Sequence, residues 1–300
     1  MRKRNPAEQK KSVEGGILAV HRGADKVLFT IVFIVFVFHC FTLLFPVAWM
    51  IMSSMKEMNE YFLGDAFAFP KEWLFRNYID AFTLLNDGKT TFVSMTLNSV
   101  WYTALSTSLS VFMPAITGYV LSKYAFPGRG VMYSIAIFAM TVPIVGAGAA
   151  YMRFIAEIGV YDTPLWVVIN NMGGFGGTFL VYYGFFKSVS WAYAEAADID
   201  GAGPFTIFFK IMLPQAVPIM LTYAITGAIG KWNEYESIIL YLPSFPTLAS
   251  GLFSYKSNAA RANYPIYFAG LIISMIPTLL IFAFFSKKIM TSISIGGLKG

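Results

Sequence analysis

Six long apolar stretches constrain the fold of this chain more than any other feature of its sequence. A bilayer core about 30 Å thick is crossed by roughly 20 helical residues, and each stretch reaches or approaches that length. Backbone N–H and C=O groups cannot face lipid unpaired, so these stretches fold as helices and not as open sheets. We therefore expect an all-α membrane protein with six transmembrane helices, at about residues 27–52, 97–121, 131–152, 165–187, 215–240 and 265–286.

The composition agrees with a membrane protein and disfavours other classes. Hydrophobic residues make up 57% of the chain and charged residues only 13%, unlike a soluble domain. The net charge is +6, but the basic residues lie beside apolar runs and form no stripe with interleaved aromatics, so we expect no nucleic-acid partner. The single cysteine, Cys40, lies in an apolar run, and no Cys/His spacing suggests a metal site.

The distribution of Lys and Arg predicts the orientation of the chain. With six spans, 14 of the 22 basic residues fall on the side of the N-terminus and seven on the opposite side. Because basic residues concentrate on the cytoplasmic side, both termini are expected there. This divides the chain into a cytoplasmic segment at 1–26, a membrane domain at 27–286 and a cytoplasmic tail at 287–300. The first apolar stretch is too long for a signal-peptide core and is expected to remain as an anchor.

A polar segment between the fourth and fifth expected spans, within the cytoplasmic loop 188–214, reads EAADIDGAGPFTIFFKIMLP. Gly201 follows a run of helix formers and suits the left-handed conformation that ends a helix. Pro204 suits the first position of a second helix, and Leu213-Pro214 is expected to end that helix. The result would be a helix-turn-helix beneath the membrane. One apolar face of its second helix is expected to hold Phe205, Phe208, Phe209 and Met212.

This segment, residues 195–214, resembles the EAA-loop signature of membrane subunits of ATP-binding-cassette importers, and we call it the EAA segment. Nearly the whole chain is similar to carbohydrate-importer permeases of the maltose-transporter type, specifically the smaller partner permease. Further matches are IGVYDTPLWVVI at 158–169, KWNEY at 231–235 and GGLKG at 296–300. The signature positions are Glu195, Ala196, Ala197, Gly201, Ile211, Leu213 and Pro214.

The resemblance implies that the EAA segment is a coupling helix that docks in a cleft of a separate ATPase subunit, with Asp198 and Glu195 as hydrogen-bond acceptors. It also implies three kinds of partner: a second homologous permease, two ATPase subunits and an extracytoplasmic solute-binding protein. The chain has no G-x-x-x-x-G-K-[ST] motif, so ATP and Mg would be used by the partner ATPase, and no cofactor or enzyme activity is expected here. The alternative for this segment is an amphipathic loop on lipid headgroups.

Polar residues inside apolar spans are costly unless they are paired or face a wet cavity. Such residues are candidates for a translocation path, although interhelical hydrogen bonds are the alternative for each of them. Glycines of GGFGG at 173–177 are expected to allow a tight helix crossing or a local break. Lys231 and Glu234 are expected to pair near the outer interface. The path candidates are Asn98, Asn170, Asn171, Thr222 and Thr226, together with the span-two hydroxyls of Ser106, Ser108 and Ser110.

The segment 241–263 joins the last two spans on the outer side and is rich in small, aromatic and turn residues. In the resembled family this loop meets the solute-binding protein, and the alternative is a solvated connector. The expected contact residues are Ser250, Gly251, Ser254 and Tyr255.

Together these features predict a permease subunit of an ATP-driven, binding-protein-dependent sugar importer in a bacterial-type inner membrane. The solute is expected to be an oligosaccharide, but the sequence does not identify it. An importer for another solute, such as a polyol phosphate, is one alternative. A self-sufficient channel or secondary transporter is another, because glycine breaks suit discontinuous helices too. An intramembrane enzyme is disfavoured because no nucleophile has a base beside it.

Overall fold

The computed structural model describes residues 23–86, 90–142, 146–258 and 262–297, and every regular element in these ranges is helical. Most of the expected cytoplasmic segment at 1–26 and the end of GGLKG lie outside the described residues. Four described helical stretches are long and apolar enough to cross a membrane. They are α2 (Gly23–Ser54), α5 (Phe92–Lys123), the stretch 204–232 and α15 (Tyr264–Gly297).

The expected third and fourth spans each consist of two shorter helices. The third is formed by α6 (Arg129–Thr141) and α7 (Gly148–Glu157), and the fourth by α8 (Pro164–Asn171) and α9 (Gly177–Ser188). In the fourth, the break falls on GGFGG, where Gly174 and Gly176 have φ of +61° and +130°. These values favour glycine, which confirms the local break expected there. At 131–152, where no break was expected, α6 ends at Thr141 and α7 begins at Gly148. The count of six crossings stays a prediction.

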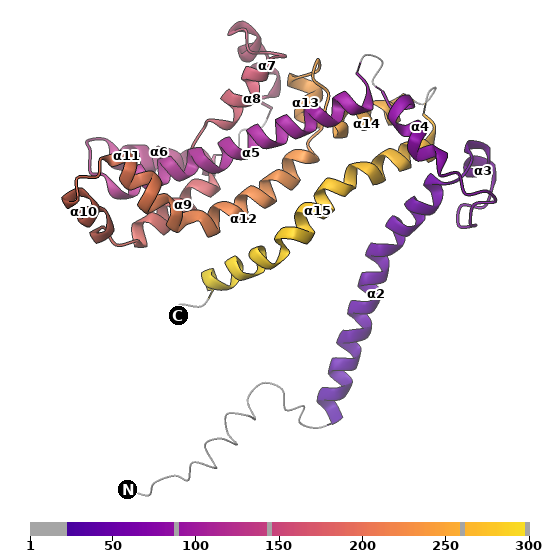
Figure 1. Ribbon diagram of the computed structural model, residues 1–300, viewed down its shortest axis with the longest axis horizontal. Coiled ribbons are helices and arrows are strands. Elements are labelled where there is room, and N and C mark those ends of the chain that lie inside the picture. The colour runs from indigo at the N-terminus through magenta and orange to yellow at the C-terminus, as the bar shows by residue number, and fades with distance from the viewer. Residues whose placement is uncertain (1–22, 87–89, 143–145, 259–261, 298–300) are drawn as a thin grey trace, which may run out of the picture.

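The bundle is organised around α5 and α12 (Leu213–Trp232). Helix α5 packs against both α9 and α12, and α12 packs in turn against α15. Figure 1 shows α5, α12 and α15 running side by side along the length of the molecule. Gly118 permits the close crossing of α5 and α9, since a Cβ there would lie 2.8 Å from Tyr182 Cβ and 2.9 Å from the backbone nitrogen of Tyr183.

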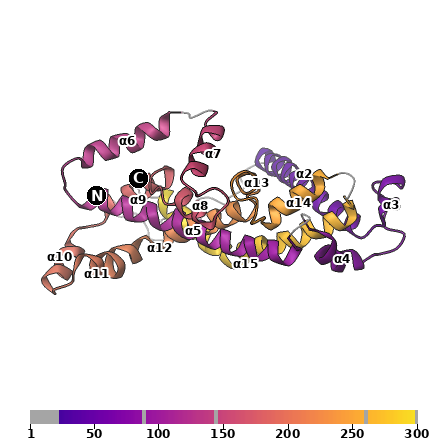
Figure 2. The ribbon, with the colours of Figure 1, turned by 90° about the horizontal axis from the view of Figure 1, so that it is seen from above.

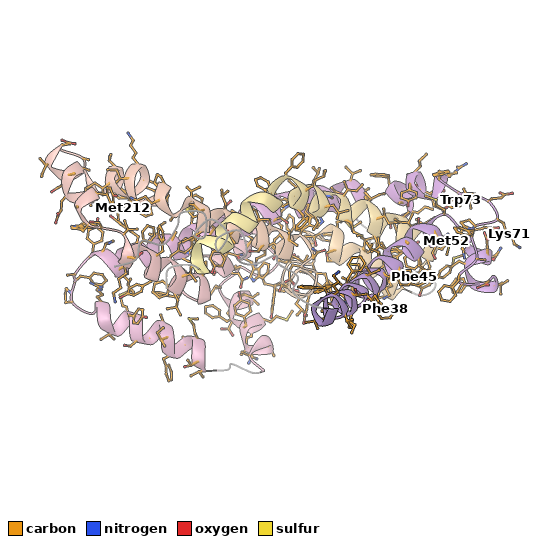
Figure 3. The ribbon with its side chains drawn as sticks, turned by 90° about the horizontal axis from the view of Figure 1, so that it is seen from below. Phe38, Phe45, Met52, Lys71, Trp73 and Met212 are labelled. Carbon is orange, nitrogen blue, oxygen red and sulfur yellow. The ribbon has the colours of Figure 1, made fainter. Side chains whose placement is uncertain are left out.

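Helix α2 leaves this bundle. It contacts α15 near its C-terminal end and diverges from the other helices toward its N-terminus (Figure 1). Its anchored end is fixed by Trp49, which donates to the Ala66 carbonyl at 2.8 Å and packs edge-on against Phe268. Residues 26–46 are all exposed, and Phe38 and Phe45 project from this part of the helix (Figure 3). A largely apolar helix is therefore left uncovered by its own chain.

Short helices cap the two ends of the bundle (Figure 2). One end carries α3 (Met58–Leu63), α4 (Arg76–Leu84) and α14 (Leu248–Ser257), and α13 (Glu236–Tyr241) lies nearer the middle (Figure 2) and contacts α14. The other end carries α10 (Ala192–Ile199) and α11 (Pro204–Thr206). Because α5 and α12 run between these ends, the EAA segment lies at the end opposite α14 (Figure 1).

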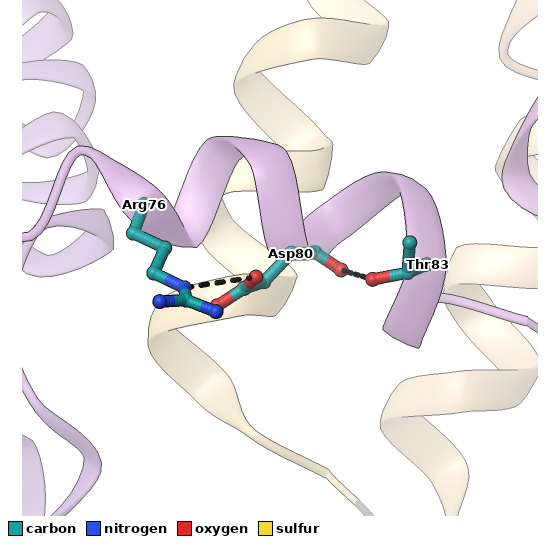
Figure 4. Close-up of polar contacts among 3 residues, drawn as sticks. All are labelled: Arg76, Asp80 and Thr83. Atoms are coloured by element: carbon teal, nitrogen blue, oxygen red, sulfur yellow. Dashed lines mark hydrogen bonds and ion pairs between the residues drawn. The ribbon is translucent and has the colours of Figure 1, made fainter.

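The charged side chains form few pairs. In the described part of the chain the only ion pair joins Arg76 Nε and Asp80 at 3.6 Å on α4, where Thr83 also donates to the Asp80 carbonyl (Figure 4). The expected pairing of Lys231 with Glu234 is wrong. Helix α12 ends at Trp232, so the two residues do not share a helix face, and Glu234 Oε1 accepts instead from the Ser237 backbone nitrogen at 3.0 Å.

Candidate functional site

The EAA segment folds as two helices around a glycine turn, as its sequence predicts. Helix α10 ends at Ile199, and Gly201 has φ +80°. The chain reversal is closed by the backbone nitrogen of Ala202, which donates to the Ala197 carbonyl at 2.9 Å. Pro204 then begins α11. A left-handed glycine and a proline at the first helical position satisfy the local requirements of this turn.

The segment has an inward and an outward face. Ala197 is buried at 8% exposure, whereas Glu195, Ala196 and Asp198 are exposed. The side chains of Glu195 and Asp198 form no hydrogen bond or ion pair that the structure records among its described residues. Ile199 is 86% exposed near the turn. Ala197 therefore serves packing within this chain, and the outward surface combines carboxylates with exposed apolar groups.

The expected apolar face of the second helix is wrong in part. Met212 and Phe208 are buried at 0% and 7% exposure, but Phe205 and Phe209 are 80% and 51% exposed. The reason is a π-helical turn, η1 (Ile207–Met212), whose i→i+5 bonding widens the turn. Residues four apart then share a face, so two of these side chains point inward and two outward.

The expected stop at Leu213-Pro214 is also wrong. Leu213 has φ −63° and ψ −40°, and the helix runs without interruption from α11 through η1 into α12. Pro214 lies two residues after the last residue of the π-helical turn, in the first turn of α12. There the altered hydrogen-bond register accommodates a residue without an N–H, so the usual penalty before proline is avoided. The EAA segment is therefore continuous with a membrane-length helix.

Aromatic packing ties the EAA segment to the bundle. The Phe208 ring lies 4.8 Å from that of Tyr119 on α5, and Tyr119 lies 5.4 Å from Phe186 on α9. Figure 3 labels Met212 at the same end of the molecule. Lys123 donates to the Val189 carbonyl and so fixes the connection between α9 and α10. Of the remaining signature residues, the same cluster holds Leu213 and, at its edge, Ile211, while Pro214 is exposed.

The five main path candidates hydrogen-bond within the chain, whereas the hydroxyl of Ser106 is buried and has no partner among the described residues. Asn98 joins two elements, because its Nδ2 donates to the Pro246 carbonyl at 3.0 Å and its Oδ1 accepts from Trp101. Asn170 accepts from the Tyr151 hydroxyl at 3.2 Å. The other three donate to carbonyls of their own helices, namely Asn171 to Val167, Thr222 to Pro218 and Thr226 to Thr222. Their role in a translocation path stays a prediction.

Two hydroxyls that the sequence did not single out behave differently. Thr103 and Thr107 on α5 are each only 8% exposed, and neither Oγ1 has a hydrogen-bond partner in the described part of the chain. Both line a groove between α5, α12 and α15. By contrast, Ser108 on the same helix donates to the Ala104 carbonyl at 2.7 Å. Their spacing of four residues places both threonines on one helix face, which is the signal that could have found them.

At the opposite end of the bundle, three of the four predicted binding-protein contacts are buried. Ser250 forms a capping box with Thr247, and Tyr255 accepts from the Asn263 backbone nitrogen at 3.1 Å. A Cβ at Gly251 would collide with the sulfur of Met95. Ser254 alone is exposed, beside a shallow depression that it forms with Ile239, Phe253, Ser257 and Asn258. The contact stays a prediction, and Ser254 is its accessible residue.

Comparisons with known proteins all match membrane components of transport systems. Residues 110–290 match the family described as "Binding-protein-dependent transport system inner membrane component". The diacetylchitobiose uptake system permease protein NgcG of Streptomyces coelicolor is 31% identical over 84% of this chain and 82% of its own length. The galactooligosaccharides transport system permease protein GanQ of Bacillus subtilis is 26% identical over 89% of this chain and 94% of its own.

A solved structure shares the fold. One chain of a bacterial ABC transporter involved in the import of the acidic polysaccharide alginate superposes with a TM-score of 0.74 and 21% identity. The match covers 89% of this chain and 98% of that chain. The overall arrangement of the helices is therefore one that a chain of an experimentally determined transporter also adopts.

Proposed function

Because the chain belongs to the family of binding-protein-dependent transport system inner membrane components, and is thus a multi-pass permease subunit, we propose that it imports an oligosaccharide with energy from partner ATPase subunits. The names of its relatives support a saccharide, since they include permeases for diacetylchitobiose, galactooligosaccharides and maltodextrin. The protein lies in a bacterial-type inner membrane with both termini in the cytoplasm, and ATP and Mg are bound by the ATPase.

The observation that carries this proposal is the continuity of the EAA segment with α12. The exposed surface of α10 and α11 carries Glu195, Asp198 and Phe205, which suit a docking site that has both cationic and apolar groups. Its inner face is fixed to the bundle by Phe208 and Met212. Two ATPase subunits would dock on the transporter, one of them on this EAA segment. Movement of that subunit would therefore be transmitted directly into a membrane helix.

The exposed surface of α2 supports a second permease as partner. Phe33, Phe36 and Leu44 are 67%, 63% and 67% exposed on a helix that touches its own bundle only near one end. Lipid could cover these side chains, but a helix held apart from its bundle is also positioned to pack against the helices of another subunit. At the end opposite the EAA segment, Ser254 and the depression beside it form the contact for the solute-binding protein.

Reconstitution in liposomes tests the proposal. The chain is purified with its second permease and ATPase subunits, and labelled diacetylchitobiose, raffinose and maltotriose are offered with the binding protein, alongside glycerol 3-phosphate. We expect uptake of at least one saccharide, only with ATP and only from the complete assembly with two ATPase copies. Uptake by the isolated chain without ATP would instead identify a channel or secondary transporter. Uptake of glycerol 3-phosphate alone would identify an importer of a polyol phosphate.

A further inference from the structure

The segment that follows α3 turns back along α2. It comprises residues 64–75, which we call the aromatic loop. The Ala66 carbonyl of this loop accepts from Trp49 Nε1 on α2 at 2.8 Å. One residue later, the ring of Phe67 lies 6.0 Å from that of Phe45, which is a further turn back along α2. The start of the aromatic loop therefore descends beside the helix that the chain has just left.

The other end of the aromatic loop returns to the end of α2. The Leu74 backbone nitrogen donates to the Met55 carbonyl at 2.9 Å. Asn77 Nδ2 then donates to the carbonyls of Ser54 and Lys56, at 2.8 and 3.0 Å. The aromatic loop is thus re-entrant, and these hydrogen bonds fix the point at which it comes back.

The length of α2 gives the depth that the loop reaches. The membrane-length stretch Lys26–Ser54 has 29 residues. It is about 43 Å long, so when centred it extends beyond a hydrocarbon core of about 30 Å by roughly 7 Å at each end. Trp49 lies about 8 Å from the C-terminal end of this helix, and Phe45 about 14 Å. The Ala66 backbone beside Trp49 therefore lies at the edge of the hydrocarbon, whereas the Phe67 ring beside Phe45 lies within it.

The polar backbone groups of the descending part are paired within the chain. Asp65 Oδ1 accepts from the Phe67 backbone nitrogen at 2.9 Å, and the Asp65 carbonyl accepts from that of Ala68 at 3.3 Å. The same carbonyl also accepts from Nζ of Lys56, a lysine that is only 2% exposed, at 3.0 Å. Because unpaired backbone groups are costly away from water, this pairing lets the loop approach an apolar environment.

Aromatic and charged side chains are segregated in this region. The exposed aromatic side chains of the loop, each at least half exposed, are Phe67, Phe69, Trp73 and Phe75. A depression of about 650 Å³ is lined instead by the charged side chains of Glu57, Glu60, Lys71 and Glu72, and none of the four aromatic residues is among the described residues that line it. Figure 3 labels Lys71 and Trp73 beyond Met52, near this end of α2. A segment with a charged and an aromatic side is typical of a membrane interface, where the charges stay in water.

The position of the aromatic side identifies lipid as its partner. The exposed apolar surface of α2 continues into the loop where Phe45 meets Phe67. A solute-binding protein lies in water and would not reach a ring below the edge of the hydrocarbon. Helix interfaces within membranes favour small residues that permit close approach, whereas the loop presents large rings on an irregular backbone. Acyl chains have no fixed shape and can surround such rings.

We propose that the aromatic loop inserts Phe67 and Phe69 into the outer leaflet of the bilayer and thereby anchors the outer end of α2. The insertion follows from the geometry of the loop and does not depend on which solute the transporter carries. The assignment to the outer leaflet rests on the topology proposed above, because the loop follows the end of α2 that is remote from the N-terminus.

Fluorescence quenching in the complete transporter in liposomes tests the insertion. In a Cys40→Ser background, Phe67→Cys and Phe69→Cys are labelled with an environment-sensitive fluorophore, and the signal of the Cys40→Ser transporter is subtracted. Glu72→Cys is the matched control, because Glu72 belongs to the same loop but lines the charged depression. Lipids with brominated acyl chains should quench the labels at positions 67 and 69 at least about threefold more strongly than the label at position 72. Aqueous iodide should quench the three labels in the reverse order.

Three results would overturn the insertion and leave the importer intact. The first is equal quenching by brominated lipid at positions 67, 69 and 72. The second is a label at positions 67 and 69 that neither brominated lipid nor iodide reaches, which would show that a partner helix covers the loop. The third is loss of quenching by brominated lipid when loaded binding protein is added, which would identify that protein as the occupant.

A second experiment changes the aromatic side itself. With the label at position 67, Phe69→Asp should lower quenching by brominated lipid at least about threefold, because a carboxylate is costly in hydrocarbon. Phe69→Trp keeps an aromatic ring and should leave the quenching unchanged. Copurification of the partner subunits shows that each variant is assembled. Full quenching in an assembled Phe69→Asp transporter would overturn the insertion of Phe69.

The leaflet is tested in spheroplasts. A thiol reagent that does not cross the membrane should label Glu72→Cys from outside, since the charged depression lies on the aqueous side of the loop. Labelling only after lysis would overturn the assignment to the outer leaflet together with the proposed topology. The quenching experiment does not depend on orientation, so failure of the topology and failure of the insertion are distinguished.

Discussion

Gly201 offers the sharpest test of the EAA segment, because the structure separates its folding role from its docking role. The φ of +80° at Gly201 favours glycine. Gly201 is nevertheless exposed, and no described atom lies within 4 Å of the position that a Cβ would take. A side chain there meets nothing in its own chain. The cost to folding is therefore confined to the backbone conformation, about 1–2 kcal/mol for a non-glycine residue and less for Asp or Asn, which adopt this region more readily.

The cost to docking is larger. Gly201 lies on the outward surface between Ile199 and Phe205, which are 86% and 80% exposed. Gly201→Asp adds bulk and a third carboxylate beside Asp198 and Asp200 on the surface that, in the proposed coupling, approaches the ATPase closely. Burying that polar group without a designated partner costs about 1–3 kcal/mol. At 1.4 kcal/mol per tenfold, docking weakens by roughly 5- to 150-fold.

A series of substitutions at Gly201 separates the effect on folding from the effect on docking. Gly201→Asn has nearly the shape of Gly201→Asp without its charge, and Gly201→Ala has little bulk but the greater backbone strain. We expect all three proteins to reach the membrane at near-normal abundance, with uptake falling in the order Ala, Asn, Asp and abolished in the last. Membrane abundance, copurified ATPase, hydrolysis stimulated by loaded binding protein and uptake are measured on the same preparations. Wild-type uptake by Gly201→Asp, with the ATPase attached and responsive, would refute the coupling role.

Three further outcomes can be measured. Phe208→Ala removes a buried ring packed on Tyr119 and should destabilise the subunit by about 3 kcal/mol or more. Phe205→Ala should instead lower ATPase retention at unchanged thermal stability, and equal melting temperatures of the two variants would contradict this. Crosslinkers at Ser254→Cys should capture the binding protein in the ATP-bound assembly, and the buried Ser250→Cys should not. A reporter active only in the cytoplasm should work after Gly300, and activity of an extracytoplasmic reporter there would reverse the topology.

The sequence correctly predicted a continuous helix wherever a long apolar stretch also keeps a regular helical backbone. This holds for α2, α5 and α15. It does not hold at 131–152, because hydropathy measures the cost of exposing side chains to water and does not report whether the backbone stays helical. At 165–187 the glycines of GGFGG indicated the break that hydropathy alone would miss. Gly174 and Gly176 leave the helix at no steric cost, and the segment remains as apolar as an intact span.

Within the EAA segment, the features set by local backbone preference could be predicted from sequence, and those set by tertiary packing could not. Gly201 and Pro204 act through their own backbone preferences, so their roles are readable from sequence. The π-helical turn at Ile207–Met212 is not, since its wider geometry is stabilised by packing of Phe208 against Tyr119, a residue nearly 90 positions away. That turn changed both the apolar face and the effect of Pro214. Thr103 and Thr107 were missed because a missing hydrogen-bond partner is visible only in three dimensions.

Helix α12 carries the EAA segment into the membrane bundle. It begins at Leu213, directly after η1, and ends at Trp232, 19 positions later, about 28 Å along the helix axis. The buried aromatic cluster prevents the EAA segment from moving alone, because Phe208 and Met212 pack into the bundle. In the proposed coupling, a rotation imposed at Phe205 would therefore turn α12 against α5. Because α12 packs directly on α5, that motion would repack the contacts between two membrane helices without any intermediate element.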